Sequence, residues 1–117
     1  MNTLLTQIAR RNNTNRNGSQ FDDATIQAVW NKARLMLGAN PSARRMDVCG
    51  AVIDRSKYGS TEETGTGWEV DHIIPVCRGG TDDLSNLQPL QWQNNRRKGD
   101  NFPLTPAQYC AVHAVRG

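Results

Sequence analysis

The segment at residues 69–83, EVDHIIPVCRGGTDD, decides how this sequence is interpreted. An aspartate and a histidine, Asp71 and His72, stand side by side in an apolar run that predicts a strand over residues 68–75. Pro75 cannot donate to a sheet ladder, so the strand should stop there. Neighbours on a strand face opposite sides, and the pair can share a site only where the strand twists or ends. The pair therefore indicates a site at the end of this strand.

Length and composition predict one small domain preceded by a flexible arm. The chain has 117 residues, of which 37% are hydrophobic, and no apolar run approaches the ~20 residues of a membrane helix. Its first residues lack the basic-then-apolar order of a signal peptide, which favours a soluble, cytoplasmic protein. Residues 1–20 are polar and rich in asparagine, typical of a flexible basic arm with one helical turn near Leu4–Ile8. The domain is expected to span residues 21–117.

Basic residues gather in two places, although the formal net charge is only +3. They are Arg10, Arg11 and Arg16 in the arm, and the run Arg96–Lys98. Such runs suit the phosphate backbone of a nucleic acid, whose binding is largely electrostatic. On charge alone, a solvated basic surface is an equally good interpretation.

The three cysteines, Cys49, Cys77 and Cys110, are far apart and odd in number. This spacing is not that of a disulfide framework, and the absence of a C-x-x-C pair argues against a zinc site. We expect reduced, half-buried thiols, with a Cys49–Cys110 bridge as the alternative.

Three helices are expected around the strand. In residues 22–37 apolar side chains recur at spacings of three and four, which predicts a helix that starts at an aspartate cap and ends at Gly38. Proline at a first helical position predicts a second helix over residues 89–98 and a third over residues 105–115. Residues 48–53 form a short apolar run that predicts a strand or extended segment.

The residue types around the strand end suit metal-assisted hydrolysis. A neutral histidine such as His72 can take a proton from water near pH 7, and Asp71 with an amide oxygen can hold a divalent cation. In the second helix Gln91, Asn95 and Lys98 fall at i, i+4 and i+7, on one face. Docking this face on the strand end would bring an amide oxygen to the cation and an ammonium group to a phosphate.

The stretch DHIIPVCRGGTDDLSNLQPL…NNRRKGD resembles the motif of HNH endonucleases, the ββα-metal nucleases. That motif opens on an Asp-His pair, here Asp71-His72, and continues to a central asparagine, here Asn86. It closes on a His or Asn three residues before a lysine, here Asn95. The resemblance is strong over residues 69–100 and weaker before them. It implies a small α+β fold, in which a two-stranded antiparallel sheet and a metal helix are flanked by further helices.

By this resemblance the chain is a metal-dependent DNA endonuclease that leaves a 5′-phosphate and a 3′-hydroxyl. His72 is then the general base, Asp71 and Asn95 hold one divalent cation, and Asn86 holds the loop that orients His72. The expected cation is Mg²⁺, with Mn²⁺ as a substitute. Four basic residues are expected to contact the DNA backbone: Arg78, Arg96, Arg97 and Lys98, of which the helical spacing favours Lys98.

Many HNH domains also hold a structural zinc through two C-x-x-C pairs. The matching positions here are Met46, Cys49, Gln91 and Asn94, of which only one is a cysteine, so no structural zinc is expected. The three tryptophans, Trp30, Trp68 and Trp92, and the last helix should pack around the motif instead.

Two other functions fit the same residues. A module of the same fold could bind nucleic acid or protein without cutting, and a ribonuclease would differ at the site mainly through the 2′-hydroxyl of its substrate. A chain of 117 residues leaves little room for a separate reading domain, so weak or no sequence specificity is expected. Cutting both strands with one active site would favour a homodimer or two encounters.

Overall fold

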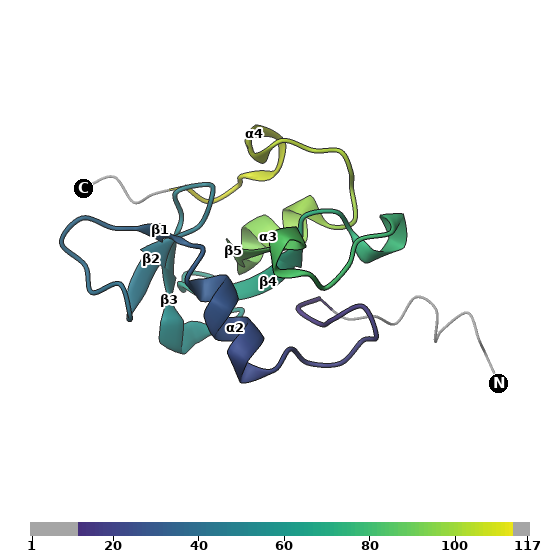
Figure 1. The fold of residues 1–117 in the computed structure, drawn as a ribbon. Helices are drawn as coiled ribbons and strands as arrows, with labels where there is room; N and C mark the ends of the chain where they lie inside the picture. The colour runs from purple at the N-terminus through teal and green to yellow at the C-terminus, as the bar shows by residue number, and fades with distance from the viewer. Residues whose placement is uncertain (1–11, 114–117) are drawn as a thin grey trace.

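The computed structural model describes residues 12–113. Within this range the chain forms a three-stranded and a two-stranded antiparallel sheet together with three α-helices. The helices are α2 (Asp23–Trp30), α3 (Trp92–Lys98) and α4 (Pro106–Tyr109); the strands are β1 (Arg34–Leu35), β2 (Arg44–Met46), β3 (Val52–Asp54), β4 (Trp68–His72) and β5 (Leu87–Gln91). Figure 1 shows α2 and α4 on opposite sides of the β4–β5 hairpin. The predicted α+β class is confirmed.

The hairpin of β4 and β5 leads directly into α3. The two strands pair from Trp68 opposite Gln91 to His72 opposite Leu87. Gln91 ends β5, and α3 starts at the residue after it, Trp92. This arrangement places the end of β4 beside the helix. It matches the two-stranded sheet followed by a helix that the sequence predicts.

Pro89 lies in β5, so the predicted helix start at this residue is wrong. It faces Val70 across the hairpin. The Val70 amide points away from β5 and donates to the Asn13 side chain at 2.8 Å. A residue without an N–H is tolerated here because this pair needs no ladder hydrogen bond. The helix end is as predicted, since Gly99 follows Lys98 as the C-cap.

The first predicted helix starts correctly but is shorter than expected. Asp22 caps α2 by accepting a hydrogen bond from the Thr25 amide at 2.7 Å. The helix ends at Trp30 rather than at Gly38, because the chain beyond it turns into β1 and pairs with β2. Leu37 is fully exposed, so further helical turns would bury no apolar side chain there.

The last helix also begins where predicted and ends early. Thr105 and Gln108 form a capping box, with Pro106 at the first helical position. The helix ends at Tyr109 because the next residue, Cys110, enters a disulfide and the amides after it bond to another side chain. The prediction of a helix over residues 110–113 is therefore wrong, and residues 114–115 lie outside the described range.

The sequence does not predict the three-stranded sheet, apart from an extended segment at residues 48–53. In this sheet β2 lies between β1 and β3. Each strand has only two or three residues, too few to show an alternation of apolar and polar positions. One cross-strand ion pair, between Arg44 Nε and Asp54 Oδ1 at 2.7 Å, supports it at the surface.

The main hydrophobic core lies between α2, β3 and the hairpin. At its centre the rings of Trp30 and Trp68 are 5.3 Å apart, and Tyr58 packs on Trp68 at 5.0 Å. Both tryptophans are fully buried, as expected. Trp92 is not part of this core, because it is half-buried and its indole donates to the Glu62 carbonyl. The core thus packs on the face of β4 opposite the face that α3 covers.

The described part of the expected arm, residues 12–20, lies against the domain. Asn13 accepts hydrogen bonds from the Val70 amide and from the Tyr58 hydroxyl. It thereby covers the outer edge of β4. Residues 1–11, where the expected helical turn and two of the arginines fall, lie outside the described range.

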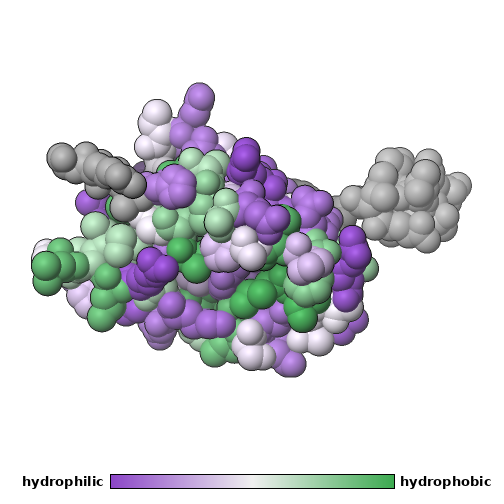
Figure 2. Space-filling view, turned by 90° about the horizontal axis from the view of Figure 1, so that it is seen from above, coloured by the Kyte–Doolittle hydropathy of each residue, from purple (hydrophilic) through white to green (hydrophobic). Residues whose placement is uncertain are grey.

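The surface is mostly hydrophilic on the face that Figure 2 shows. Hydrophobic residues gather at the left end of this view and in its lower middle. Leu35 at the end of β1 and Leu37 in the loop after it are exposed. Within residues 12–113 there is no helix with the length and apolar character needed to cross a membrane.

Cys49 and Cys110 form a disulfide bond, so the expectation of reduced thiols is wrong for this pair. They are 61 positions apart in the sequence, and only the fold brings their Cα atoms to 5.5 Å, a usual disulfide spacing. The third cysteine, Cys77, is a free and exposed thiol. The bond ties the segment after α4 to the loop before β3.

Removing this disulfide should lower the free energy of unfolding by about 2–4 kcal/mol, because the unfolded chain gains the freedom of a long open loop. Urea denaturation of Cys49→Ser with Cys110→Ser, compared with the oxidised wild type, measures the loss. Cys77→Ser is the matched control and should keep wild-type stability. Equal unfolding midpoints for the double variant and the wild type would contradict the prediction.

Candidate active site

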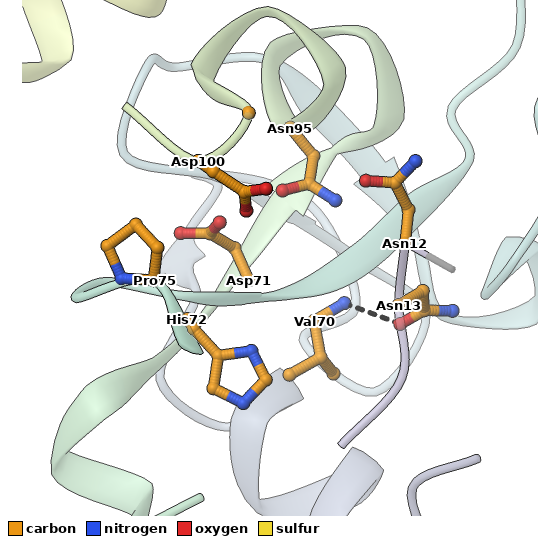
Figure 3. A pocket seen from close by; sticks show the side chains of 9 residues that line it. Asn12, Asn13, Val70, Asp71, His72, Pro75, Asn95 and Asp100 are labelled. Atoms are coloured by element: carbon orange, nitrogen blue, oxygen red, sulfur yellow. Dashed lines mark hydrogen bonds between the residues drawn. The ribbon is translucent and has the colours of Figure 1, made fainter. Parts of the chain in front are cut away.

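Asp71 on β4 and Asn95 on α3 line one small cavity, together with Asp100 just beyond the helix. Its volume of about 20 Å³ holds one water-sized occupant. Figure 3 shows the two carboxylates and the Asn95 amide oxygen on the same side of β4. The fold thus brings together the two oxygen-bearing side chains predicted to hold a cation and adds a second carboxylate.

Asp71 is held from two sides. Lys98 Nζ lies 3.2 Å from its Oδ1, and Gln88 Nε2 donates to its Oδ2 at 3.0 Å. Burial raises the pKa of the Asp71 carboxyl above its usual value, and the nearby Lys98 ammonium only partly offsets this effect. A carboxylate desolvated in this way interacts more strongly with a nearby cation than an exposed one does.

Asn95 directs its amide oxygen to the cavity because its nitrogen is engaged elsewhere. Nδ2 donates to Glu69 Oε1 at 2.8 Å, and Glu69 also forms an ion pair with Arg96 at 2.9 Å. Asn95 and Lys98 are buried on α3, as predicted, whereas Gln91, which was predicted to share their helix face, is buried as the last residue of β5.

His72 lies on the opposite face of β4, as the strand alternation predicts (Figure 3). Its ring packs against Phe21, with the ring centroids 5.8 Å apart. Nε2 lies 2.7 Å from Asp82 Oδ1, and the Arg16 amide donates to the same oxygen at 3.1 Å. When Nε2–H donates to Asp82, Nδ1 is the ring nitrogen that can accept a proton. His72 nevertheless borders the same small cavity as Asp71.

Asn86 closes the loop between β4 and β5. Its Oδ1 accepts from the Ile74 amide at 2.8 Å, and its Nδ2 donates to the carbonyls of Ile74 and Thr81 at 3.1 and 2.9 Å. Its own carbonyl accepts the Ile73 amide. These bonds replace strand pairing beyond His72, and they are the contacts that a loop-holding residue needs.

The four basic residues expected to contact DNA have different surroundings. Lys98 is 3% exposed and donates to the His72 carbonyl at 2.9 Å, so it is built into the interior of the site. Arg96 is engaged in the ion pair described above. Arg78 and Arg97 are exposed and line one groove of about 530 Å³. Among residues 12–113, neither of these two arginines has an ion-pair partner.

The positions that match a structural zinc site hold other interactions. Asp47 Oδ2 accepts hydrogen bonds from the Gln91 amide at 2.9 Å and from Asn94 Nδ2 at 3.0 Å. Asn94 Oδ1 accepts two amides of the segment after α4. Cys49 is in the disulfide and Met46 lies in β2. This donor set does not fit zinc, because it offers no thiolate or imidazole. A buried carboxylate and a disulfide join the elements here.

Sequence reasoning missed three residues that border or support the site: Glu69, Asp82 and Asp100. The signal for Glu69 was present, because strand alternation puts it on the same face as Asp71. Asp82 reaches His72 only through the folded loop, which no local spacing reveals. Asp100 lies beyond the helix end, where helical periodicity no longer applies.

These features define a class of domain: a β-hairpin followed directly by a helix, with a carboxylate, an imidazole and an amide at their junction. A family model described as HNH endonuclease matches residues 47–101. Residues 47–101 therefore match the HNH endonuclease family, and the resemblance found in the sequence is confirmed. Domains of this family are usually nucleases, which act on nucleic acids. No curated protein and no solved structure gives a significant match.

Proposed function

We propose that this protein is a metal-dependent DNA endonuclease that hydrolyses phosphodiester bonds and leaves a 5′-phosphate and a 3′-hydroxyl. One observation carries the proposal: Asp71 and Asn95 line one small cavity, and His72, whose ring faces the other side of β4, borders it as well. A general base beside a pair of oxygen ligands supplies both needs of the reaction, a nucleophile made from water and charge stabilisation at the phosphate.

His72 is the general base in this proposal. Asp82 accepts the Nε2–H, which fixes the tautomer and leaves Nδ1 to take a proton from water. The same carboxylate stabilises the imidazolium that the proton transfer creates. Asn86 supports the base indirectly, because it ties the carbonyl of Thr81, next to Asp82, to the end of β4.

The donor set at the cavity fits a hard divalent cation. Asp71 would contribute a carboxylate oxygen and Asn95 an amide oxygen, with the Asp100 carboxylate bordering the same space. Mg²⁺ prefers one or two protein oxygens and keeps water and substrate phosphate as its other ligands. Such a cation, with Mn²⁺ as a substitute, would stabilise the negative charge on the leaving 3′-oxygen.

The groove lined by Arg78 and Arg97 is the proposed path of the DNA backbone. It continues along residues 101–104, which directly follow Gly99 and Asp100 at the cavity. Exposed guanidinium groups bind phosphates regardless of base identity, which agrees with weak or absent sequence specificity. In this proposal, Lys98 contributes its charge from inside the site.

Conversion of supercoiled plasmid to nicked and linear forms tests the proposal. The wild-type protein should cut in Mg²⁺ or Mn²⁺, and EDTA should stop the reaction. Single-stranded RNA incubated in parallel separates a DNA endonuclease from a ribonuclease. A folded wild-type protein that cuts neither substrate with either cation would overturn the proposal and favour a binding module.

As the pH is lowered, cation affinity should be lost at a higher pH than an ordinary aspartate would predict. Only deprotonated Asp71 binds a cation, and burial raises its pKa, so protons compete with the metal over a wider range of pH. Affinity is therefore present above the raised pKa and is lost as the pH falls through it. Calorimetric Mn²⁺ titrations from acidic to neutral pH measure the midpoint. A midpoint near the ordinary aspartate value of about 3.9 would contradict the prediction.

A further inference from the structure

We propose that Glu69 is a positioning residue that determines which atom of Asn95 faces the cation; this inference rests on the proposed function. Glu69 lies on β4, on the face covered by α3, and is 2% exposed. Its Oε1 accepts from Asn95 Nδ2 at 2.8 Å. Its Oε2 accepts from Arg96 Nη2 at 2.9 Å, and Arg96 Nε lies 3.2 Å from Oε1.

The two ends of an asparagine amide have opposite chemistry. The oxygen accepts hydrogen bonds and can bind a cation, whereas the NH₂ group only donates. The ends are nearly equal in size, so shape alone does not select one orientation of Asn95. A carboxylate paired with an arginine accepts hydrogen bonds and donates none, so Glu69 selects the NH₂ end. The oxygen then turns to the side of Asp71 and Asp100, where Figure 3 shows it.

A purely structural role explains the placement of Glu69 poorly. Burying a carboxylate beside an arginine whose side chain is 41% exposed has a desolvation cost, and an apolar residue of similar volume would avoid it. The contact with Asn95 supplies the reason, because only an acceptor at this point holds the amide oxygen toward the cavity. Outer partners of this kind orient metal ligands in many proteins.

The test is a substitution, Glu69→Gln, that reverses the direction of the hydrogen bond between residue 69 and Asn95. In Glu69→Gln the Arg96 guanidinium, which only donates, retains the new amide oxygen, so the new NH₂ group faces Asn95. The Asn95 amide must then turn its oxygen away from the cavity, and Mn²⁺ affinity should fall about 10- to 100-fold. Adding Asn95→Asp should restore the affinity to within a few-fold of wild type. The introduced carboxylate accepts the new N–H and keeps its second oxygen for the cation.

Mn²⁺ titration calorimetry on the full chain gives a readout independent of cleavage, and thermal unfolding verifies that each variant is folded. Glu63→Gln removes the same charge from an exposed connector and should bind like the wild type. Asn95→Asp alone places two carboxylates together and should bind Mn²⁺ less tightly than the double variant. Comparing these two variants tests the positioning role even if Glu69→Gln does not fold.

Two results would overturn the positioning role while the proposed function stands. One is wild-type Mn²⁺ affinity in Glu69→Gln, and the other is a double variant that binds no better than both single variants. A wild-type protein that binds no Mn²⁺ and cuts no DNA would overturn the proposed function instead. Rescue by the combined substitutions is a result that a merely structural role does not produce.

Discussion

His72→Ala should reduce DNA cleavage by about 10²–10⁴-fold, the usual contribution of a positioned general base. The imidazole is oriented by Asp82 at 2.7 Å, and His72 is one of the residues that line the cavity of Asp71. The substitution removes the group that takes the proton from water but none of the proposed cation ligands. Cleavage should therefore fall while Mn²⁺ affinity stays within a few-fold of wild type. Plasmid nicking rates at saturating Mg²⁺ and calorimetric Mn²⁺ titrations measure the two quantities.

The chain offers a matched control for this experiment. Its other histidine, His113, is exposed, and His113→Ala should cut like the wild type. Because His72 is buried against Phe21, His72→Gln keeps more of the side-chain volume and guards against loss of fold. Undiminished cleavage by folded His72→Ala would exclude His72 as the base or reveal a contaminating nuclease.

Lys98→Met should lower the free energy of unfolding by about 3–5 kcal/mol, because it leaves the Asp71 carboxylate buried without its cationic partner. The two residues are 3% and 6% exposed, and Nζ lies 3.2 Å from Oδ1. Methionine preserves much of the apolar stem of lysine and removes only the ammonium group. Urea denaturation in EDTA measures the loss without interference from bound cations.

A double variant separates the stability lost with the ion pair from the stability lost with side-chain packing. Asp71→Asn with Lys98→Met should be more stable than Lys98→Met alone, since no uncompensated charge remains buried. Lys57, an exposed lysine, gives the control, and Lys57→Met should change stability by no more than about 0.5 kcal/mol. If Lys98→Met unfolds like the wild type but binds DNA weakly, Lys98 is instead the backbone contact that the helical spacing favours.

Local signals predicted most of the element boundaries that depend on neighbouring residues. The cap at Asp22, one of two candidate aspartates, the stop at Gly99 and the start at Pro106 all match the structure, because capping involves bonds within one helical turn. Helix length was predicted less well. The end of α2 at Trp30 depends on strand pairing, and the end of α4 depends on a disulfide, and both involve distant residues.

The proline rule failed at one position for a related reason. Pro89 is typical of a first helical turn, yet it lies in β5. Its pairing with Val70 permits it there, because this pair needs no ladder hydrogen bond from the residue on β5. The register of one strand against another leaves no local pattern in the sequence. For the same reason the sequence did not predict the three-stranded sheet and gave the Cys49–Cys110 bond only as an alternative.

The sequence by itself determined the reactive groups of the candidate site. Asp71 and His72 are adjacent, and Asn95 and Lys98 share a helix face, so local geometry places each pair, and the family resemblance predicts that the two pairs meet. Only the tertiary structure decided what orients these groups. Asp82 reaches His72 through a folded loop, and Glu69 meets Asn95 across the packing of a strand on a helix. Orientation depends on contacts between segments far apart in the chain, and such contacts exist only once the hydrophobic core has brought those segments together.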